Sequence, residues 1–125
     1  MKALSTDKAP AAIGPYSQAI DSGAGLLFLS GQIPIDPATG SFAEGGVKEQ
    51  TRQCILNAQA ILQSAGLSLA NVVKTTVYLA DMGDFAAMNE VYAQFFTQPF
   101  PARSAVAVKA LPKGALVEVE CIAAK

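Results

Sequence analysis

The chain has 125 residues, of which nine are lysine or arginine and ten are aspartate or glutamate, so its formal net charge at pH 7 is -1. This length suits one domain with its own hydrophobic core, and the scattered, balanced charges give no support for nucleic-acid binding. The absence of histidine excludes Ser-His-Asp triads, Cys-His pairs and most transition-metal sites, so carboxylate, tyrosine, lysine or water must carry out any acid–base step.

The composition also bears on assembly and location. Hydrophobic residues make up 51% of the chain and charged residues 15%, which is few charges for a soluble monomer and indicates that another copy covers part of the surface. Cys54 and Cys121 lie far apart with no third partner, which predicts buried thiols in a reducing compartment and neither a zinc nor a redox site. The first ten residues include Lys2, Asp7 and Lys8, and no segment reaches membrane-spanning length, so the protein is expected in the cytoplasm.

The first half of the chain predicts a hairpin, a loop and a helix. Tyr16–Asp21 and Leu26–Ser30 are short extended candidates on either side of a Ser-Gly-Ala-Gly turn. The prolines and glycines of Gly31–Gly46 indicate a loop. From Val47 to Ala65 apolar residues recur at helical spacing, and Gly66 is a plausible stop.

The second half begins with the most regular strand pattern, Asn71–Ala80, which is rich in Val and Thr. Its expected apolar face comprises Val73, Thr75, Val77 and Leu79. Asp81 or Asp84 can accept hydrogen bonds from the first free amides of a second helix, which ends before Pro99 and Pro101. The apolar side of that helix is marked by Phe85, Met88, Tyr92, Phe95 and Phe96.

Two further alternating segments, Arg103–Ala110 and Ala115–Ile122, are joined by Leu111–Gly114, whose Pro and Gly suit a tight connection and predict a second hairpin. The element order ββαβαββ, with hairpins at both ends, predicts an α+β fold with a mixed sheet and both helices on one face. The other face then needs a cover. An oligomer would supply it, and clefts between subunits are natural ligand sites.

Arg103 follows Phe-Pro-Ala at the start of an apolar strand. A guanidinium in such a position is suited to binding a planar carboxylate through paired hydrogen bonds, which predicts small organic acids as ligands. Glu118 and Glu120 are two residues apart and so share one strand face. The alternatives are a structural ion pair or solvated charge at Arg103, and glutamates that only keep a sheet face wet.

Six segments, in this order and spacing, resemble the RidA (YjgF) family. They are residues 12–19 (AIGPYSQA), 30–34 (SGQIP), 71–77 (NVVKTTV), 84–89 (DFAAMN), 100–104 (FPARS) and 111–120, which hold LPKG and VEVE. The resemblance covers nearly the whole chain. It implies a single RidA-like domain over residues 1–125 with a chorismate-mutase-like α+β sandwich.

The resemblance also implies an activity: hydrolysis of reactive 2-imino acids, such as 2-iminopropanoate and 2-iminobutanoate, to 2-keto acids and ammonia. It implies no cofactor, and a homotrimer with sites between subunits. The absence of histidine, the balanced charges and the lack of a membrane-length segment predict no metal site and neither a nucleic acid nor a membrane as partner. On the family pattern Arg103 binds the substrate carboxylate, Glu118 positions or activates water, and Tyr16 lines the cleft. The further pocket positions are Ser30, Gly31, Asn89 and Ala105. The last replaces a cysteine common in the family and keeps a backbone amide that can donate.

Imine hydrolysis needs a protonated nitrogen, a water near the C=N carbon and a base for the proton of that water. Burial of Glu118 would raise its pKa towards neutrality, and a nearby Arg103 would oppose that shift. Tyr16 could equally be a half-buried aromatic, and Asn89 an ordinary helix-face amide. The rival function is a non-catalytic trimeric binder of small acids, or a chaperone-like or translation-inhibiting protein.

Overall fold

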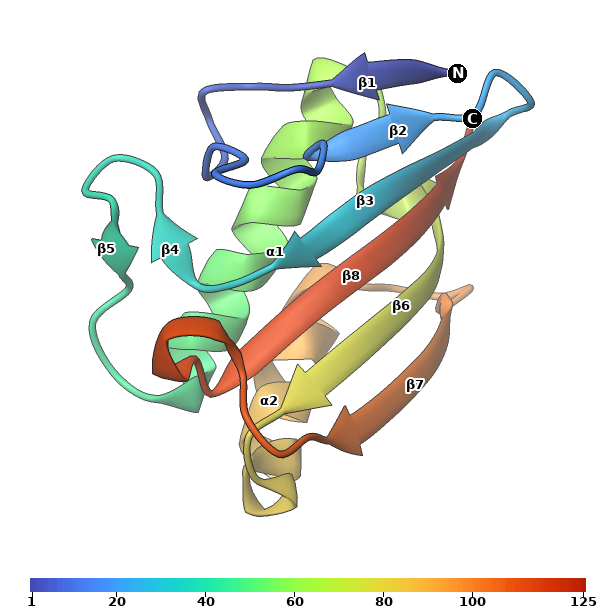
Figure 1. Cartoon of the computed structure of the whole chain (residues 1–125). Helices are drawn as coiled ribbons and strands as arrows, with labels where there is room; N and C mark the ends of the chain where they lie inside the picture. Colours follow the sequence, from blue (N-terminus) through green and yellow to red (C-terminus); the bar gives the residue numbers. More distant parts are fainter.

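The main sheet is built from segments in which buried and more exposed residues alternate. In a computed structural model that describes residues 1–125, its strands are β1 (Lys2–Leu4), β2 (Ala19–Asp21), β3 (Leu26–Gln32), β6 (Val72–Leu79), β7 (Ala102–Ala107) and β8 (Val117–Ala124). They lie in the order β1-β2-β3-β8-β6-β7 (Figure 1), and every neighbouring pair is antiparallel except β6 and β7. The mixed sheet was predicted correctly.

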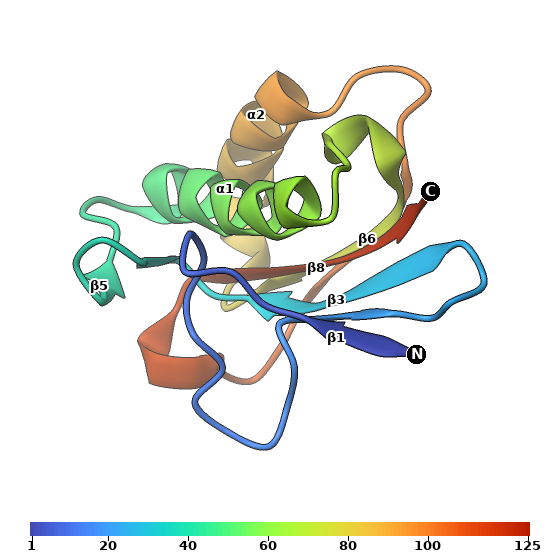
Figure 2. The same cartoon turned by 90° about the horizontal axis from the view of Figure 1, so that it is seen from above.

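Two helices, α1 (Val47–Ser64) and α2 (Phe85–Phe95), cover one face of this sheet (Figure 2). The buried face of β8 comprises Val117, Val119, Cys121 and Ala123, which join one core with the apolar stripe of α1. The opposite face of the sheet, here called the open face, carries the alternate residues of the same strands, including Phe28, Tyr78, Val106, Glu118 and Glu120. The predicted α+β fold with both helices on one face is confirmed.

Capping contacts explain where the helices begin and end. The Glu49 side chain accepts a hydrogen bond from the backbone N–H of Gly46 at 2.8 Å, at the start of α1. Gly66 follows the last turn with a φ of +75°, a conformation that favours glycine. Asp81 caps the short 3₁₀ turn Met82–Asp84, which precedes α2, by accepting from the Gly83 N–H at 2.7 Å. Neither helix combines the length and apolarity needed to cross a bilayer.

The predicted hairpin between the last two strands is wrong. β7 pairs in parallel with β6, and β8 pairs with the other edge of β6, so β6 separates the two expected partners. Residues 108–116 pass across the end of β6: the Val108 N–H bonds to the Leu79 carbonyl at 2.8 Å, and the Ala80 N–H to the Leu116 carbonyl at 3.0 Å. The expected turn is a 3₁₀ turn, Pro112–Gly114, inside this crossing.

Two smaller expectations also need correction. Val73 does not share the buried face with Thr75, because the pairing of β6 with β8 shifts register between Val72 and Lys74 and leaves Val73 46% exposed. The predicted loop 31–46 contains a small separate hairpin, β4 (Ile35–Asp36) with β5 (Ser41–Phe42).

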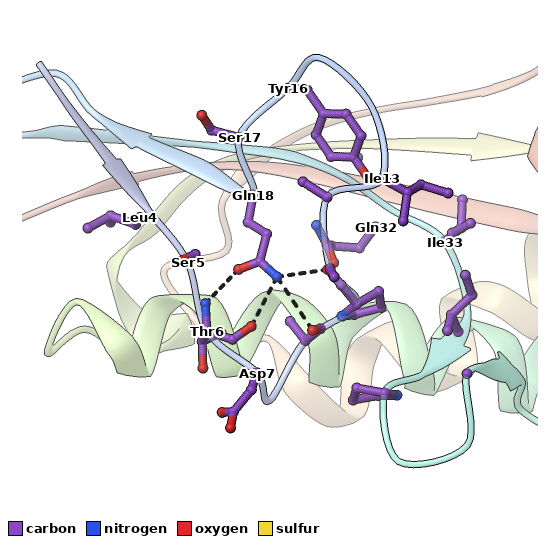
Figure 3. A pocket seen from close by; sticks show the side chains of 18 of the residues that line it. Leu4, Ser5, Thr6, Asp7, Ile13, Tyr16, Ser17, Gln18, Gln32 and Ile33 are labelled. Atoms are coloured by element: carbon purple, nitrogen blue, oxygen red, sulfur yellow. Dashed lines mark hydrogen bonds between the residues drawn. The ribbon is translucent and has the colours of Figure 1, made fainter.

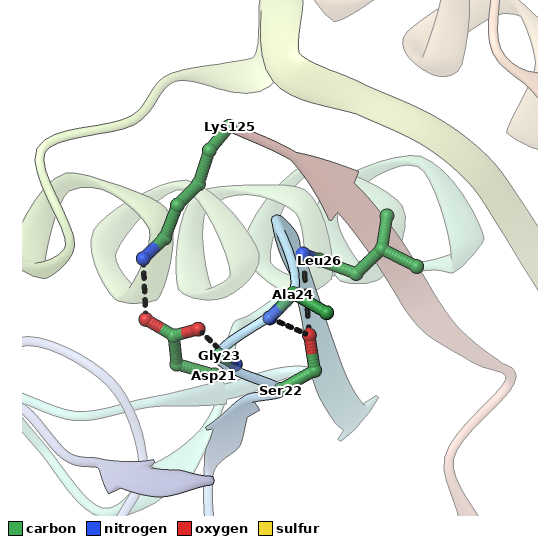
Figure 4. Close-up of polar contacts among 6 residues, drawn as sticks. All are labelled: Asp21, Ser22, Gly23, Ala24, Leu26 and Lys125. Atoms are coloured by element: carbon green, nitrogen blue, oxygen red, sulfur yellow. Dashed lines mark hydrogen bonds and ion pairs between the residues drawn. The ribbon is translucent and has the colours of Figure 1, made fainter.

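The N-terminal hairpin of β2 and β3 is present as predicted, and the end of the chain is fastened to its turn (Figure 4). Lys125 pairs with the Asp21 carboxylate at 2.5 Å, and the Lys125 N–H donates to the Gly25 carbonyl at 3.0 Å. Within the turn, the Ser22 hydroxyl oxygen accepts from the Ala24 and Leu26 N–H groups. These contacts fix the far end of β3 relative to β8, so the register of the strands that carry Ser30, Gly31 and Glu118 is well defined.

Candidate functional site

Arg103 lies on the helix-covered face of β7, next to α2. Its Nη1 donates to Asn89 Oδ1 at 2.6 Å, and its guanidinium carbon lies 4.7 Å from the centre of the Tyr92 ring and 5.5 Å from that of Phe85. Residues 85, 89 and 92 follow helical spacing and therefore face the strand together. The chain has only two ion pairs, neither involving Arg103, so the structural ion-pair alternative is excluded within one chain.

Ala105 follows Arg103 by two residues and lies on the same face of β7, paired with Val77 of β6. Arg103, Asn89 and Ala105 therefore come together at one edge of the sheet, and we call them the arginine group. Tyr92 and Phe85, which contact the guanidinium, were expected only as apolar residues of the second helix. Their spacing from Asn89 was the signal that could have linked them to Arg103.

Glu118 lies on the open face of β8, beside the irregular end of β3. The pairing of β3 with β8 shifts register between Leu29 and Gln32, which places Ser30 and Gly31 in a bulge. A Cβ atom on Gly31 would lie 2.1 Å from Glu118 Oε1, so only glycine leaves room for this carboxylate. Burial, and secondly the charge of Glu120, raise the pKa of Glu118. The site thus contains a half-buried carboxylate that takes up a proton more readily than a free one.

The Gly31–Glu118 contact gives a direct test of this placement. We expect Gly31→Ala to displace the Glu118 side chain and, on the expected role of Glu118 in activating water, to lower kcat for 2-iminobutanoate by about tenfold or more. Gly46→Ala is the matched control, since a Cβ there meets nothing closer than Glu49 Oε2 at 4.0 Å. Steady-state kinetics of both variants check the prediction, and equal kcat values would contradict it.

A cavity of about 870 Å³ is lined by Tyr16, Gly31 and the N-terminal segment (Figure 3), and Glu118, which is not among its lining residues, is linked to it through Gly31. The buried Gln18 side chain holds that segment: its Oε1 accepts from the Thr6 N–H at 2.7 Å, and its Nε2 donates to the Pro10 carbonyl at 2.7 Å. Tyr16 is half exposed. We call Tyr16, Ser30, Gly31 and Glu118 the glutamate group.

Ser30 takes part in the same local network. Its hydroxyl donates to the Ser17 carbonyl at 2.6 Å, and its N–H donates to the Gln18 carbonyl at 3.0 Å. The hydroxyl hydrogen therefore fastens the loop that carries Tyr16 to the end of β3. The lone pairs of the same oxygen stay available to accept a hydrogen bond from a ligand.

The structure does not bring the arginine group and the glutamate group together within one chain. Arg103 pairs with Thr75 on the helix-covered face, whereas Glu118 pairs with Tyr78 on the open face. Within one chain no arginine contributes to the pKa shift of Glu118, so the expected opposing effect of Arg103 would have to come from another copy. A ligand held by Arg103 in one chain lies across the sheet from Glu118 of the same chain.

Neither cysteine belongs to the arginine group or to the glutamate group. Cys54 and Cys121 are buried, as predicted, and burial raises the pKa of both thiols, to about 12 for Cys121. Since both cysteines are buried, we expect an aromatic disulfide reagent to label no thiol in the native protein and both after denaturation. A thiol that reacts rapidly before unfolding would contradict this prediction.

The chain is similar to known proteins over nearly its whole length. The model of the family described as "Endoribonuclease L-PSP" matches residues 6–125. RutC family protein y4sK of Sinorhizobium fredii is 58% identical over 95% of this chain and 94% of its own length. The 2-iminobutanoate/2-iminopropanoate deaminase of Capra hircus is 53% identical over 96% of this chain and 87% of its own.

Solved structures give the same result. The crystal structure of E. coli TdcF with bound serine superposes with a TM-score of 0.94 at 44% identity, covering 100% of this chain and 99% of that one. A two-helix, mixed-sheet domain with this similarity over its whole length defines the class of protein. The chain belongs to the RidA (YjgF) family.

Proposed function

We propose that the protein hydrolyses reactive 2-imino acids, among them 2-iminopropanoate and 2-iminobutanoate, to 2-keto acids and ammonia. The observation that carries the proposal is Arg103, whose guanidinium is fixed by Asn89 and has no carboxylate partner in the chain. The deaminase names of relatives such as that of Capra hircus, and the serine held by TdcF, support a ligand with a carboxylate and a neighbouring nitrogen.

In the proposed reaction Arg103 binds the substrate carboxylate and leaves C2 of the protonated imine open to water. Glu118 accepts a proton from that water as its oxygen bonds to C2, and the C=N electron pair moves to nitrogen. Glu118 then returns the proton to the nitrogen, the C–N bond breaks and ammonia leaves as the C=O bond forms, while the hydroxyl proton passes to the Glu118 carboxylate and from there to the departing ammonia, which is released as ammonium. A raised pKa suits Glu118 to both transfers, because it makes the carboxylate a stronger base in the first, while the carboxylic acid stays acidic enough to protonate an amine nitrogen in the second.

The placement of the two groups on opposite faces leads us to propose that the site forms between copies of this chain, in a homotrimer. One copy supplies the glutamate group from its open face and the next supplies the arginine group from its β7 edge. The open face also exposes Phe28 (44%) and Val106 (46%), apolar side chains that a second copy would cover.

The activity is tested by generating 2-iminobutanoate in situ with an amino-acid oxidase and measuring 2-oxobutanoate release with and without the protein. We expect faster release with the protein, lost in Arg103→Ala. A rate equal to the spontaneous one would refute the proposal. Such a result would favour a non-catalytic binder or chaperone-like protein. In that case Arg103→Ala should still protect client proteins from aggregation.

The shared site is tested by mixing two inactive variants, Arg103→Ala and Glu118→Gln, after dissociation and reassembly. In a random mixture about a quarter of the sites would pair an intact arginine with an intact glutamate from the neighbouring copy. We expect activity to return in the mixture to about that fraction. Continued inactivity, although mixed oligomers form, would place both residues of each site in the same chain.

The endoribonuclease description of the family model suggests RNA as another substrate. A net charge of -1 gives little electrostatic attraction to a phosphate backbone, so we do not extend the proposal to nucleic acid.

A further inference from the structure

The guanidinium of Arg103 lies near two aromatic rings from one helix. The distances to the ring centres are 4.7 Å for Tyr92 and 5.5 Å for Phe85, both within the range of a cation–π contact. Asn89, between them on α2, occupies Nη1. Three side chains of a single helix therefore contact one guanidinium, and the remaining N–H groups of the fork are left for a ligand.

The Tyr92 ring is itself fixed in place. Its hydroxyl shares a hydrogen bond of 2.8 Å with Thr75 Oγ1, and the ring stacks on Phe96 with centroids 4.4 Å apart. Only 6% of Tyr92 is exposed, and this burial raises its pKa, so the phenol is neutral beside the guanidinium. A ring held at its hydroxyl and on its face has little freedom to move when a ligand arrives.

Thr75 closes the arrangement. Thr75 on β6 is the register partner of Arg103 in the parallel pairing of β6 with β7. It therefore lies beside the arginine whose guanidinium contacts the Tyr92 ring. Thr75 is completely buried, which is unusual for a hydroxyl and requires the partner that Tyr92 provides. β7, α2 and β6 are thus linked through Arg103, Tyr92 and Thr75.

We infer that Tyr92 and Phe85 are positioning residues for Arg103, and that Thr75 fixes Tyr92 for this task. The rings limit the positions of the guanidinium, so that its free N–H groups are already oriented when the carboxylate binds. This inference rests on the proposed function for the identity of the ligand. It adds that affinity for the carboxylate depends on residues that touch neither the substrate nor the reacting carbon.

The test compares Tyr92→Leu, which removes the ring, with Tyr92→Phe, which keeps it. With 2-iminobutanoate generated in situ, we expect Tyr92→Leu to raise KM by about five- to tenfold with kcat within about twofold of wild type. Tyr92→Phe keeps a ring that attracts a cation but loses the hydrogen bond to Thr75, so its KM should rise by less, about two- to threefold. An unchanged KM in Tyr92→Leu, or an equal rise in Tyr92→Phe, overturns the inference.

Two controls separate positioning from loss of stability. Val91→Ala makes a buried lesion in the same helix without removing a contact to Arg103, and should leave KM unchanged. The methyl ester of the substrate lacks the carboxylate charge, so its KM should be equal in wild type and Tyr92→Leu. If Tyr92→Leu does not fold, Phe85→Leu removes the other, more exposed ring and should raise KM two- to fivefold in its place.

Binding of 2-oxobutanoate, measured by calorimetry, separates this inference from the proposed function. If the wild type binds the keto acid but does not turn over the imine, the proposed function fails. The inference then stands if Tyr92→Leu weakens binding by about five- to tenfold, and fails if it does not. If the wild type neither binds the keto acid nor speeds hydrolysis of the imine, both are overturned.

Discussion

Arg103→Lys is expected to lower kcat/KM for 2-iminobutanoate by about 100-fold, which corresponds to about 2.7 kcal/mol. Lysine keeps the positive charge but loses the planar fork, and with it the paired hydrogen bonds to a carboxylate and the bond to Asn89. The loss should appear mainly in KM, because the carboxylate is bound in both the ground state and the transition state. Steady-state kinetics of the purified variant measure it.

Arg52→Lys is a closely matched control. Arg52 also bonds to a side-chain amide, that of Gln94 at 2.9 Å, and also lies over an aromatic ring, 5.6 Å from the centre of Phe95. It joins α1 to α2 on the outer side of the helices, away from both groups of the candidate site. We expect unchanged kinetics for Arg52→Lys, and equal losses in the two variants would remove the special role given to Arg103.

Glu118→Gln is expected to lower kcat by about 100-fold or more, because the amide cannot accept the proton of the attacking water. The same substitution should stabilise the protein. The pKa of Glu118 is raised in the folded state, so the folded chain binds more protons than the unfolded chain just above the ordinary pKa of 4.5. Stability conferred by the protonated carboxyl is therefore lost as pH rises through this window.

Thermal unfolding at two pH values checks the sign of this effect. Glu118→Gln should have the higher Tm at pH 7, and the difference should disappear below the ordinary pKa of 4.5, where both chains are neutral at this position. An active Glu118→Gln variant would show that Glu118 is not the base. A Tm lower than that of wild type at pH 7 would show that burial does not disfavour the charged form of Glu118.

Glu120→Gln is the control for this prediction and carries a further consequence. Glu120 lies two residues away on the same face and accepts a hydrogen bond from the Tyr78 hydroxyl at 3.2 Å. Its charge is the second cause of the raised pKa of Glu118. We therefore expect Glu120→Gln to stay active, with the acid limb of its pH–rate profile moved to lower pH. A limb moved to higher pH, or not moved at all, would contradict this.

The elements that could be predicted from sequence are those whose pattern is local and long. The helix from Val47 keeps its apolar spacing over 18 residues, and the alternation in β8 extends over eight. The hairpin expected between β7 and β8 was wrong because strand pairing is not local: β6, far earlier in the chain, takes the place between them. β1 and the β4–β5 hairpin are too short to give any pattern.

The candidate site shows the same division. Alternation predicted that Glu118 and Glu120 share a face, and the structure confirms it. The faces of Arg103 and Glu118 could not be compared, because that comparison depends on β7 joining β6 in parallel. The bulge that brings Gly31 into contact with Glu118 could not be predicted either, because one extra residue in a strand pairing produces no recognisable pattern in the sequence.

The bulge and the helix that contacts Arg103 are separate pieces of the fold. On the proposed function, binding of the substrate carboxylate depends on α2 and β7, while the chemistry at the neighbouring carbon depends on β3 and β8. Substitutions in α2 and β7 can therefore change ligand binding without changing the geometry of β3 and β8, and the reverse also holds. Such independence would let related proteins change their substrate while keeping the reaction, or lose the reaction and still bind the ligand.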